Sequence, residues 1–252
     1  ELRDRFGDHF VAQSPRGHGG KKSWTVGSEA DWSDLEQQLA GRTVRIAEWI
    51  EGRPGTVGAV VDESGKVLVT APIVQVTGDP ALTLQPLGST GNDFCWRPQP
   101  HPGPSAAQLA ERLGPVLAGR GFRGHFGIDF VFDGSDCLLI EVNARLTASF
   151  ALYVEWEPRL LQAHLAAVCG EPMESGRLES VPGGQLILHN VCSADAPPLD
   201  EDEGCWPQPG GAVAPGARRG RWISRGEVVA ASGELSSPAL EFTEGAVFRR
   251  PS

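Results

Sequence analysis

The sequence has little of what marks a secreted, zinc-binding or membrane protein. Its five cysteines are widely spaced and include no Cys-x-x-Cys pair, so neither a zinc site nor a disulfide framework is predicted, and we expect structural thiols. No apolar stretch approaches the roughly 20 residues that a membrane-spanning helix needs, and the opening Glu-Leu-Arg-Asp-Arg is unlike a signal peptide. We therefore expect a cytoplasmic protein that does not contact a membrane.

Basic residues are also in the minority. The chain has 22 Lys and Arg against 32 Asp and Glu, a formal net charge of -10. Because nucleic-acid-binding proteins usually present a basic stripe, this balance argues against a nucleic-acid partner, and a small anionic ligand would need a local positive pocket. The 252 residues, 40% of them hydrophobic, are enough for one large domain or two smaller ones, and no internal repeat is evident.

The N-terminal part predicts short strands and helices. The expected elements are the end of a helix at 2–6, strands at 9–13, 23–26 and 43–50, a helix at 31–39 capped by Ser28 or Asp31, and a hairpin of 56–61 with 66–71. Residues 51–55 are expected to interrupt the chain between strands. The tip at 14–22 is basic and rich in glycine, and its backbone N–H groups can surround phosphate oxygens. It has neither a Walker nor a Rossmann pattern, so a plain exposed turn stays an alternative.

The rest of the chain predicts an α+β protein. Residues 79–104 contain several Pro and Gly and little periodicity, which predicts a long loop. Residues 105–120 have the clearest helical spacing, with Ser105 as the cap and Gly121 at the end. The remaining expected elements are an apolar helix at about 157–168 and short strands within 183–192, 222–231 and 239–248.

Residues 124–149 are the most informative segment. Two apolar runs flank a turn-forming Asp-Gly-Ser-Asp and predict an antiparallel strand pair that carries Asp129, Glu141 and Asn143. Side chains two residues apart on a strand share a face, so Glu141, Asn143 and Arg145 project together if the strand stays extended through Arg145. Oxygen ligands beside a guanidinium suit Mg²⁺ and a nucleoside triphosphate. Acidic residues that merely face water are the structural alternative.

In their order, these elements resemble the ATP-grasp superfamily over about residues 8–170. The most specific piece is Ile-Glu-Val-Asn-Ala-Arg at 140–145, which is similar to the Glu-x-Asn-x-Arg strand of the biotin carboxylase and carbamoyl-phosphate synthetase branch. The resemblance implies an ATP-grasp fold, in which two α+β subdomains clasp ATP. Its expected parts here are a lid subdomain at 1–52, a catalytic subdomain at 53–170 and a small C-terminal β-rich region at 171–252.

The resemblance also implies roles for individual residues. Glu141 and Asn143 would ligate Mg²⁺, with Mn²⁺ as an alternative, and Asp129 would be a further acidic ligand. Arg145 would contact the acyl-phosphate or its carboxylate precursor, and a salt bridge to Glu141 or Asp129 is the structural alternative. The implied ATP contacts are Gln13, Gly19, Gly20, Lys21, Lys22, Glu48, Trp49, Ile50 and Glu51, of which Trp49 could equally be a core aromatic. Candidate substrate contacts, where solvation alone is the alternative, are Gln75, Thr77, Asn92, Asp93, Thr147 and Ser149.

The sequence departs from the family pattern in three places. Gln13 stands where the family usually has a lysine and supplies no charge, so either Lys21 or Lys22 would compensate from the loop or nucleotide affinity would be low. Gly-Arg-Pro follows the hinge where many relatives have an acidic ribose contact, so that contact would come from Glu51 or be absent. The usual N-terminal domain is not among these residues, which begin with Glu1, so we expect an upstream segment or a separate chain to complete the site.

The resemblance implies an ATP-dependent carboxylate-amine ligase. Such an enzyme forms an amide or peptide bond through an acyl-phosphate and releases ADP and phosphate, and we expect an amino acid or peptide substrate of specialised metabolism. The glycine-rich hairpin would close as a lid over the intermediate. An ATP-dependent carboxylase or carbamoyl-forming enzyme that uses bicarbonate, and a catalytically inactive nucleotide-binding scaffold, stay open as alternatives. The sequence names neither the carboxylate nor the amine, and it leaves open whether the protein is a homodimer.

Overall fold

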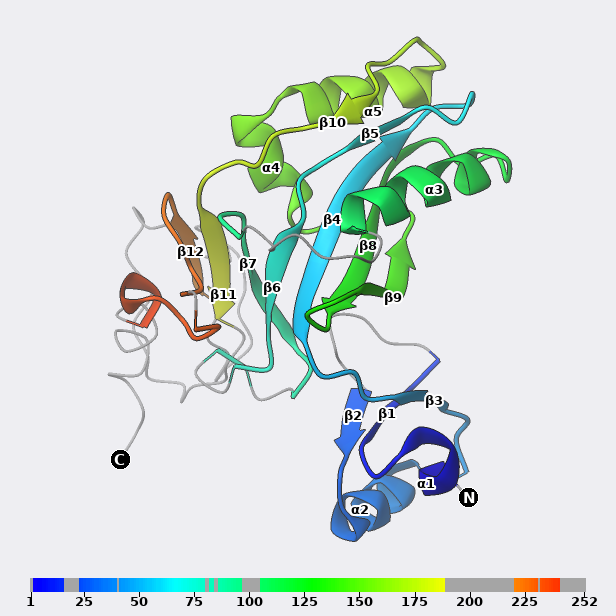
Figure 1. Cartoon of the computed structure of the whole chain (residues 1–252), viewed down its shortest axis with the longest axis vertical. Helices are drawn as coiled ribbons and strands as arrows, with labels where there is room; N and C mark the ends of the chain where they lie inside the picture. The colour runs from blue at the N-terminus through cyan, green and yellow to red at the C-terminus, as the bar shows by residue number, and fades with distance from the viewer. Residues whose placement is uncertain are drawn as a thin grey trace, which may run out of the picture.

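The computed structural model describes residues 2–15, 23–39, 41–79, 82–83, 86–96, 105–188, 220–230 and 232–240. Two β-sheets, one of three strands and one of nine, organise these residues together with several helices. In Figure 1 the small sheet lies below the large one, and the chain passes between them once, just after the third strand. The α+β class predicted from the sequence is confirmed.

The small sheet has the strand order β2-β1-β3, with every pair antiparallel. Its elements are α1 (Leu2–Phe6), β1 (Phe10–Gln13), β2 (Ser23–Val26), α2 (Glu29–Leu39) and β3 (Arg45–Glu48). Side chains alternate along β1, so Phe10 and Ala12 are buried against Val26 and Leu35, whereas Val11 and Gln13 point to the opposite face. Helices α1 and α2 cover one face of this sheet, and none of the helices in the described ranges covers the other face.

Helix α2 begins two residues earlier than its apolar spacing predicts. Ser28 Oγ accepts the backbone N–H of Asp31 at 3.1 Å, and Asp31 Oδ2 accepts the N–H of Gly27 at 3.0 Å. Of the two predicted caps, Ser28 is therefore the one at the start of the helix, and its bond satisfies the Asp31 N–H, which the first turn leaves without a helical partner.

The large sheet has the order β10-β5-β4-β6-β7-β11-β12, while β8 pairs with the other edge of β4 and β9 pairs with β8. Its strands are β4 (Arg53–Val61), β5 (Val67–Val69), β6 (Ile73–Thr77), β7 (Ser89–Asp93), β8 (Gly124–Phe132), β9 (Cys137–Asn143), β10 (Gly176–Arg177), β11 (Gly184–Leu188) and β12 (Gly220–Ser224). The pairs are antiparallel except β10 with β5. Strands β11 and β12, from the predicted β-rich region, extend this same sheet beyond β7.

Helices cover both faces of the large sheet (Figure 1). Helix α3 (Ala106–Ala118) packs on the face that carries Val57, Phe126 and Ile128. Its predicted cap is confirmed, because Ser105 and Gln108 form a reciprocal capping box, and it ends at Gly119, two residues before the predicted Gly121. Helices α4 (Phe150–Trp156) and α5 (Arg159–Cys169) pack on the opposite face.

Four expectations about local structure are wrong. Residues 53–55 are the start of β4 rather than an interruption, because Pro54 stands near the strand end, where a missing N–H is tolerated. The predicted loop at 79–104 contains β7, which pairing with β6 and β11 holds despite its polar sequence. Helix α4 was not expected at all. The last predicted strand was expected from residue 239, but residues 237–240 are helical, and 241–248 lie outside the described residues.

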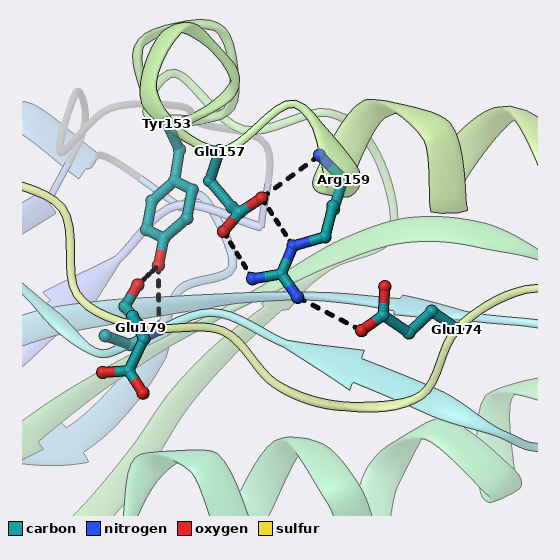
Figure 2. A network of polar contacts seen from close by, with 6 residues as sticks. Tyr153, Glu157, Arg159, Glu174 and Glu179 are labelled. Carbon is teal, nitrogen blue, oxygen red and sulfur yellow. Dashed lines mark hydrogen bonds and ion pairs between the residues drawn. The ribbon is translucent and has the colours of Figure 1, made fainter.

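A network of polar contacts ties α4 and α5 to the strands beneath them (Figure 2). The Tyr153 hydroxyl donates to the carbonyl of Glu179 at 2.6 Å and accepts the N–H of Ala71 at 3.2 Å. Arg159 pairs with Glu157 at 2.7 Å and with Glu174 at 3.2 Å. Helix α4 begins five residues after Arg145, so this network also holds the element that follows the end of β9.

The described ranges contain no helix long and apolar enough to cross a bilayer. Among the cysteines within them, Cys137 is buried, Cys95 is half-buried and Cys169 is exposed. Cys192 and Cys205 lie outside the described residues.

Candidate functional site

Asp129, Glu141 and Asn143 lie on one face of the large sheet. Asp129 on β8 stands directly opposite Glu141 on β9, and Gly127 stands opposite Asn143, so the side chains project together. The Asn143 amide Nδ2 donates to Asp129 Oδ2 at 3.0 Å. Asp129 is half-buried, whereas Glu141 is exposed. The structure therefore brings the three predicted metal ligands together. Of their two carboxylates, that of Glu141 is exposed and that of Asp129 is partly shielded from water.

Arg145 reaches this cluster by a different route from the one expected. Strand β9 ends at Asn143, and the N–H of Arg145 donates to the Asn143 carbonyl at 2.8 Å, which turns the chain. The exposed guanidinium then donates through Nη2 to Asn143 Oδ1 at 3.1 Å and through Nη1 to the Leu146 carbonyl at 3.0 Å. Arg145 forms no ion pair with Asp129 or Glu141, which are both described.

Two features of the surroundings disfavour the charged form of the Asp129 carboxyl. Burial raises its pKa, and the neighbouring charge of Glu141 acts in the same direction. Hydrogen bonds from Thr56, Asn143 and Gln75 oppose that rise by favouring the carboxylate. A bound cation would relieve both the desolvation and the repulsion, so the donor set fits a hard divalent cation such as Mg²⁺.

The described residues supply only part of a coordination sphere. They include no group of three or more His, Cys, Asp and Glu side chains that could hold a metal ion. The cluster offers two carboxylates and the amide oxygen of Asn143. Mg²⁺ commonly binds through one or two carboxylates and completes its octahedron with waters and substrate phosphates, so this partial set is of the expected kind.

A row of side-chain amides continues the site across the sheet. Gln75 on β6 donates through Nε2 to Asp129 Oδ1 at 2.9 Å. Gln75 stands opposite Asn92 on β7, which stands opposite Gln185 on β11. The Gln185 Nε2 donates to Asn92 Oδ1 at 3.2 Å and approaches the carbonyl of Ala148 at 3.4 Å. The sequence indicated Gln75 and Asn92 but not Gln185, which only strand register brings to the row.

Asp93 has a different setting from its neighbour Asn92. Its side chain is 1% exposed. Oδ1 accepts the N–H of Cys95 at 2.6 Å, and Oδ2 accepts those of Val228 and Val229 at 2.7 and 2.6 Å. Three backbone donors thus occupy the carboxylate, and Asp93 ties the chain around Val228 to β7. This geometry gives Asp93 a structural role.

The other candidate substrate residues lie near the edges of the site. Thr77 is half-buried at the end of β6, opposite Ser89 across an irregularity in the pairing. Ser149, 8% exposed, has its Oγ 3.1 Å from that of Thr147 just before α4. The hydroxyls of Thr147 and Ser149 belong to the turn that follows Arg145.

The helix-free face of the small sheet carries a second polar group. Gln13 stands opposite Ser23 on β2 and opposite Arg45 on β3, so the three side chains share that face. The Gln13 amide donates to Ser23 Oγ at 3.4 Å, and Arg45 is exposed. Sequence reasoning missed Arg45, because only the β1-β3 register places its charge beside Gln13. The neighbouring Gly19, Gly20, Lys21 and Lys22 lie outside the described residues.

The predicted hinge residues lie at the end of β3 and just after it. Glu48 and Glu51 are exposed, and Ile50 is half-buried. The Trp49 ring stacks on His9 with centroids 4.7 Å apart, and its Nε1 donates to Glu51 Oε1 at 2.6 Å. Glu51 is therefore already bonded to the hinge tryptophan, and Trp49 contacts the segment that leads into β1.

The chain matches the family model described as an ATP-grasp domain over residues 4–149. No curated protein matches the sequence. Solved structures resemble it in fold at low sequence identity. N5-carboxyaminoimidazole synthase from Aspergillus clavatus, in complex with ADP and 5-aminoimidazole ribonucleotide, is 17% identical with a TM-score of 0.64, covering 97% of this chain and 64% of that one.

Two further structures show the same fold. N5-carboxyaminoimidazole synthetase from Staphylococcus aureus, complexed with ADP, is 12% identical with a TM-score of 0.63, covering 98% of this chain and 62% of that one. Biotin carboxylase from Campylobacter jejuni, in a β-γ-ATP complex, is 13% identical with a TM-score of 0.57, covering 89% of this chain and 55% of that one. The chain thus spans less than two thirds of the length of each.

Proposed function

Since the chain belongs to the ATP-grasp family and has the ATP-grasp fold expected from its sequence, we propose that it is an ATP-dependent carboxylate-amine ligase. The observation that carries this proposal is the cluster of Asp129, Glu141 and Asn143 on one sheet face, with the Arg145 guanidinium bonded to it. Carboxylates to hold a metal-bound triphosphate and a cation to hold an activated carboxylate are what this chemistry requires.

The proposed reaction has two steps. A substrate carboxylate oxygen attacks the γ-phosphorus of ATP, and the bond from that phosphorus to the β-phosphate oxygen breaks. The products of this step are an acyl-phosphate and ADP. An amine nitrogen then attacks the acyl carbon and loses a proton, and the C–O bond to phosphate breaks to release inorganic phosphate. Arg145, with a planar fork of donors, would bind the carboxylate and then the acyl-phosphate oxygens.

Asp129, Glu141 and Asn143 would hold Mg²⁺, or Mn²⁺, against the ATP phosphates. The metal would supply charge neutralisation as the γ-phosphoryl group moves. Asn143 has a second task in this arrangement, because it bonds both Asp129 and Arg145 and so sets the position of the guanidinium relative to the carboxylates.

The small sheet would supply the opposite wall for the nucleotide. The segment at 48–51 would contact the adenine, as expected from the sequence. Arg45 would provide the positive charge that Gln13 lacks, because both stand at the end of the β1-β2 hairpin nearest its glycine-rich tip and on the same helix-free face. Lys21 and Lys22 are further candidates for phosphate contact.

The row of Gln75, Asn92 and Gln185 would line the substrate side, with Thr77 and Ser149 at its margin. Side-chain amides both donate and accept hydrogen bonds, which suits an uncharged polar or zwitterionic substrate such as an amino acid or peptide. Bicarbonate is the second candidate carboxylate, because the structures of similar fold include a biotin carboxylase and N5-carboxyaminoimidazole synthetases.

Release of ADP and phosphate tests the proposed function directly. The purified protein should release both from Mg-ATP in the presence of one carboxylate and an amine acceptor from a panel of amino acids. Glu141→Gln should lower turnover about 100-fold, since it removes a charge that would hold the metal-bound phosphates. Glu36→Gln, which changes an exposed glutamate on α2, is the matched control and should leave turnover unchanged.

The same assay separates the alternatives. ADP release that needs bicarbonate but no amino acid would favour the carboxylase. Tight ATP binding without turnover across the panel would refute the ligase and favour a nucleotide-binding scaffold.

Removing the positive charge at position 45 and then adding one at position 13 tests the role of Arg45. Arg45→Gln should weaken binding of ATP about 10-fold, the effect of losing roughly 1.4 kcal/mol, while leaving adenosine binding unchanged. Adding Gln13→Lys to that variant should restore ATP affinity to within about 3-fold, because the new charge stands on the opposing residue. Arg5→Gln is the control, since Arg5 lies over Phe6 on the helix side of the small sheet. Equal ATP affinity in wild type and Arg45→Gln would remove Arg45 from the nucleotide site.

A further inference from the structure

Beneath the Arg145 turn lies a buried histidine that the proposed mechanism does not use. His125, on β8, is 2% exposed, and its Nδ1 lies 3.0 Å from the Arg145 carbonyl oxygen. A carbonyl only accepts hydrogen bonds, so Nδ1 carries the proton and donates. Burial lowers the pKa of His125 to about 4, which keeps the ring neutral at physiological pH. His125 is thus a neutral donor whose partner is the backbone of Arg145 itself.

Both the ring and the backbone of His125 make further contacts. Its edge-on contact with Phe150, the first residue of α4, has centroids 4.7 Å apart at 74°. Its backbone N–H donates to His164 Nδ1 on α5 at 3.0 Å. Across the strand pair, a Cβ at Gly58 would lie 3.0 Å from His125 Nε2, so glycine there leaves room for the ring.

The turn after Arg145 also rests on β8 at a second point. A Cβ at Gly127 would lie 2.4 Å from Thr147 Cγ2, so the absent side chain of Gly127 lets Thr147 pack directly on the strand. His125 and Gly127 are two residues apart and face the same side of β8. The turn is therefore held to β8 by one hydrogen bond and one close packing contact, while its guanidinium end is held by Asn143.

We propose that His125 is a positioning residue, which fixes the Arg145 guanidinium by anchoring the backbone carbonyl of Arg145 to β8. The proposal rests on the function proposed for Arg145. His125 does not reach the substrate, so it would act only through the placement of Arg145. A shift of about 1 Å in a catalytic group can lower turnover about 100-fold, so an anchor of this kind has a measurable effect.

Two substitutions separate the donor from the bulk of the ring. His125→Phe keeps an aromatic ring against Phe150 but has no donor, and it should lower kcat about 10-fold or more with little change in the KM for ATP. His125→Asn places an amide Nδ2 close to the position of Nδ1 and should recover most of the lost turnover. Equal losses in the two variants would show that packing, and not the hydrogen bond, is what matters, and would overturn the proposal.

A double-mutant cycle with Arg145→Ala tests whether the effect passes through Arg145. If it does, His125→Phe should change turnover less than about 2-fold in the Arg145→Ala background. The same fold-loss in both backgrounds would overturn the proposal. Residues that act through one another are non-additive, whereas a general loss of structure would lower both backgrounds alike.

Amide hydrogen exchange gives a readout that does not need turnover. His125→Phe should speed exchange of the Arg145 and Phe150 amides about 10-fold or more relative to Ala110 in α3, whereas His125→Asn should not. Unchanged exchange would overturn the anchor whatever the assay shows. If the wild-type protein has no ligase activity but His125→Phe still speeds exchange of these amides, the proposed function is refuted and the anchor stands.

Discussion

Asp93→Asn is expected to lower the free energy of unfolding by about 3 kcal/mol. The substitution keeps the shape of the side chain but turns one of its two acceptor oxygens into a donor. Backbone N–H groups face both oxygens, so whichever way the amide points, at least one buried N–H loses its partner. Chemical denaturation followed by tryptophan fluorescence would measure the change.

The location of the loss distinguishes this account from a general weakening. Hydrogen exchange should rise first around Val228 and Val229, which the Asp93 carboxylate holds, and only later in α3. Asp34→Asn, on the exposed surface of α2, makes the same chemical change and should alter stability by less than about 0.5 kcal/mol. Asp93→Asn with full stability but lost turnover would instead assign Asp93 to the substrate site.

Acidification from about pH 7 to about pH 4 is expected to remove roughly 3 kcal/mol of stability through His125. Its folded pKa is about 4 against an ordinary 6.5, because burial disfavours the charged ring. Between these values the unfolded chain binds a proton that the folded protein does not, so stability is present above about pH 6.5 and falls as the pH falls. Urea unfolding at a series of pH values would measure it.

Other groups modify this profile in known directions. Burial also lowers the pKa of His164, whose Nδ1 accepts the N–H of His125 and would lose that bond on protonation, so it adds to the loss. Burial raises the pKa of Asp129. At pH values above the ordinary pKa of an aspartate, the folded protein therefore binds more protons at this group than the unfolded chain does, so the contribution of Asp129 to stability increases as the pH falls. The difference between wild type and His125→Asn isolates the first contribution, with His9→Asn as an exposed control. A difference that does not change between about pH 6.5 and pH 4 would contradict the expectation.

What could be predicted from the sequence is what neighbouring residues determine. The capping box of Ser105 and Gln108 lies within one helical turn, and the strand pair that carries Asp129 and Glu141 closes over a four-residue turn. Their geometry follows from local chemistry. Strand β7 and helix α4 could not be found in this way, because β7 has a polar sequence and is held by pairing with β6 and β11.

The site shows the same division. The cluster on β8 and β9 was indicated by a motif within one segment. Gln185 and Arg45 were missed because each gains its place from a register between strands that the sequence does not encode locally. Asp93 and Asn92 are adjacent polar residues that the sequence could not tell apart, and the alternation of a strand sends one to backbone donors and the other to the amide row.

The bond from Val228 to Asp93 also has a consequence for synthesis. The two residues are 135 positions apart, so Asp93 leaves the ribosome roughly 7 to 27 seconds before its partner at ordinary elongation rates. Through that interval its carboxylate has to stay hydrated, and the edge of β7 that β11 later covers is open to other chains. The family match ends at residue 149, yet β7 gains its second neighbour only when residues 184–188 emerge. The nascent chain therefore completes the β7 side of this sheet last, when β11 and then β12 are added to it.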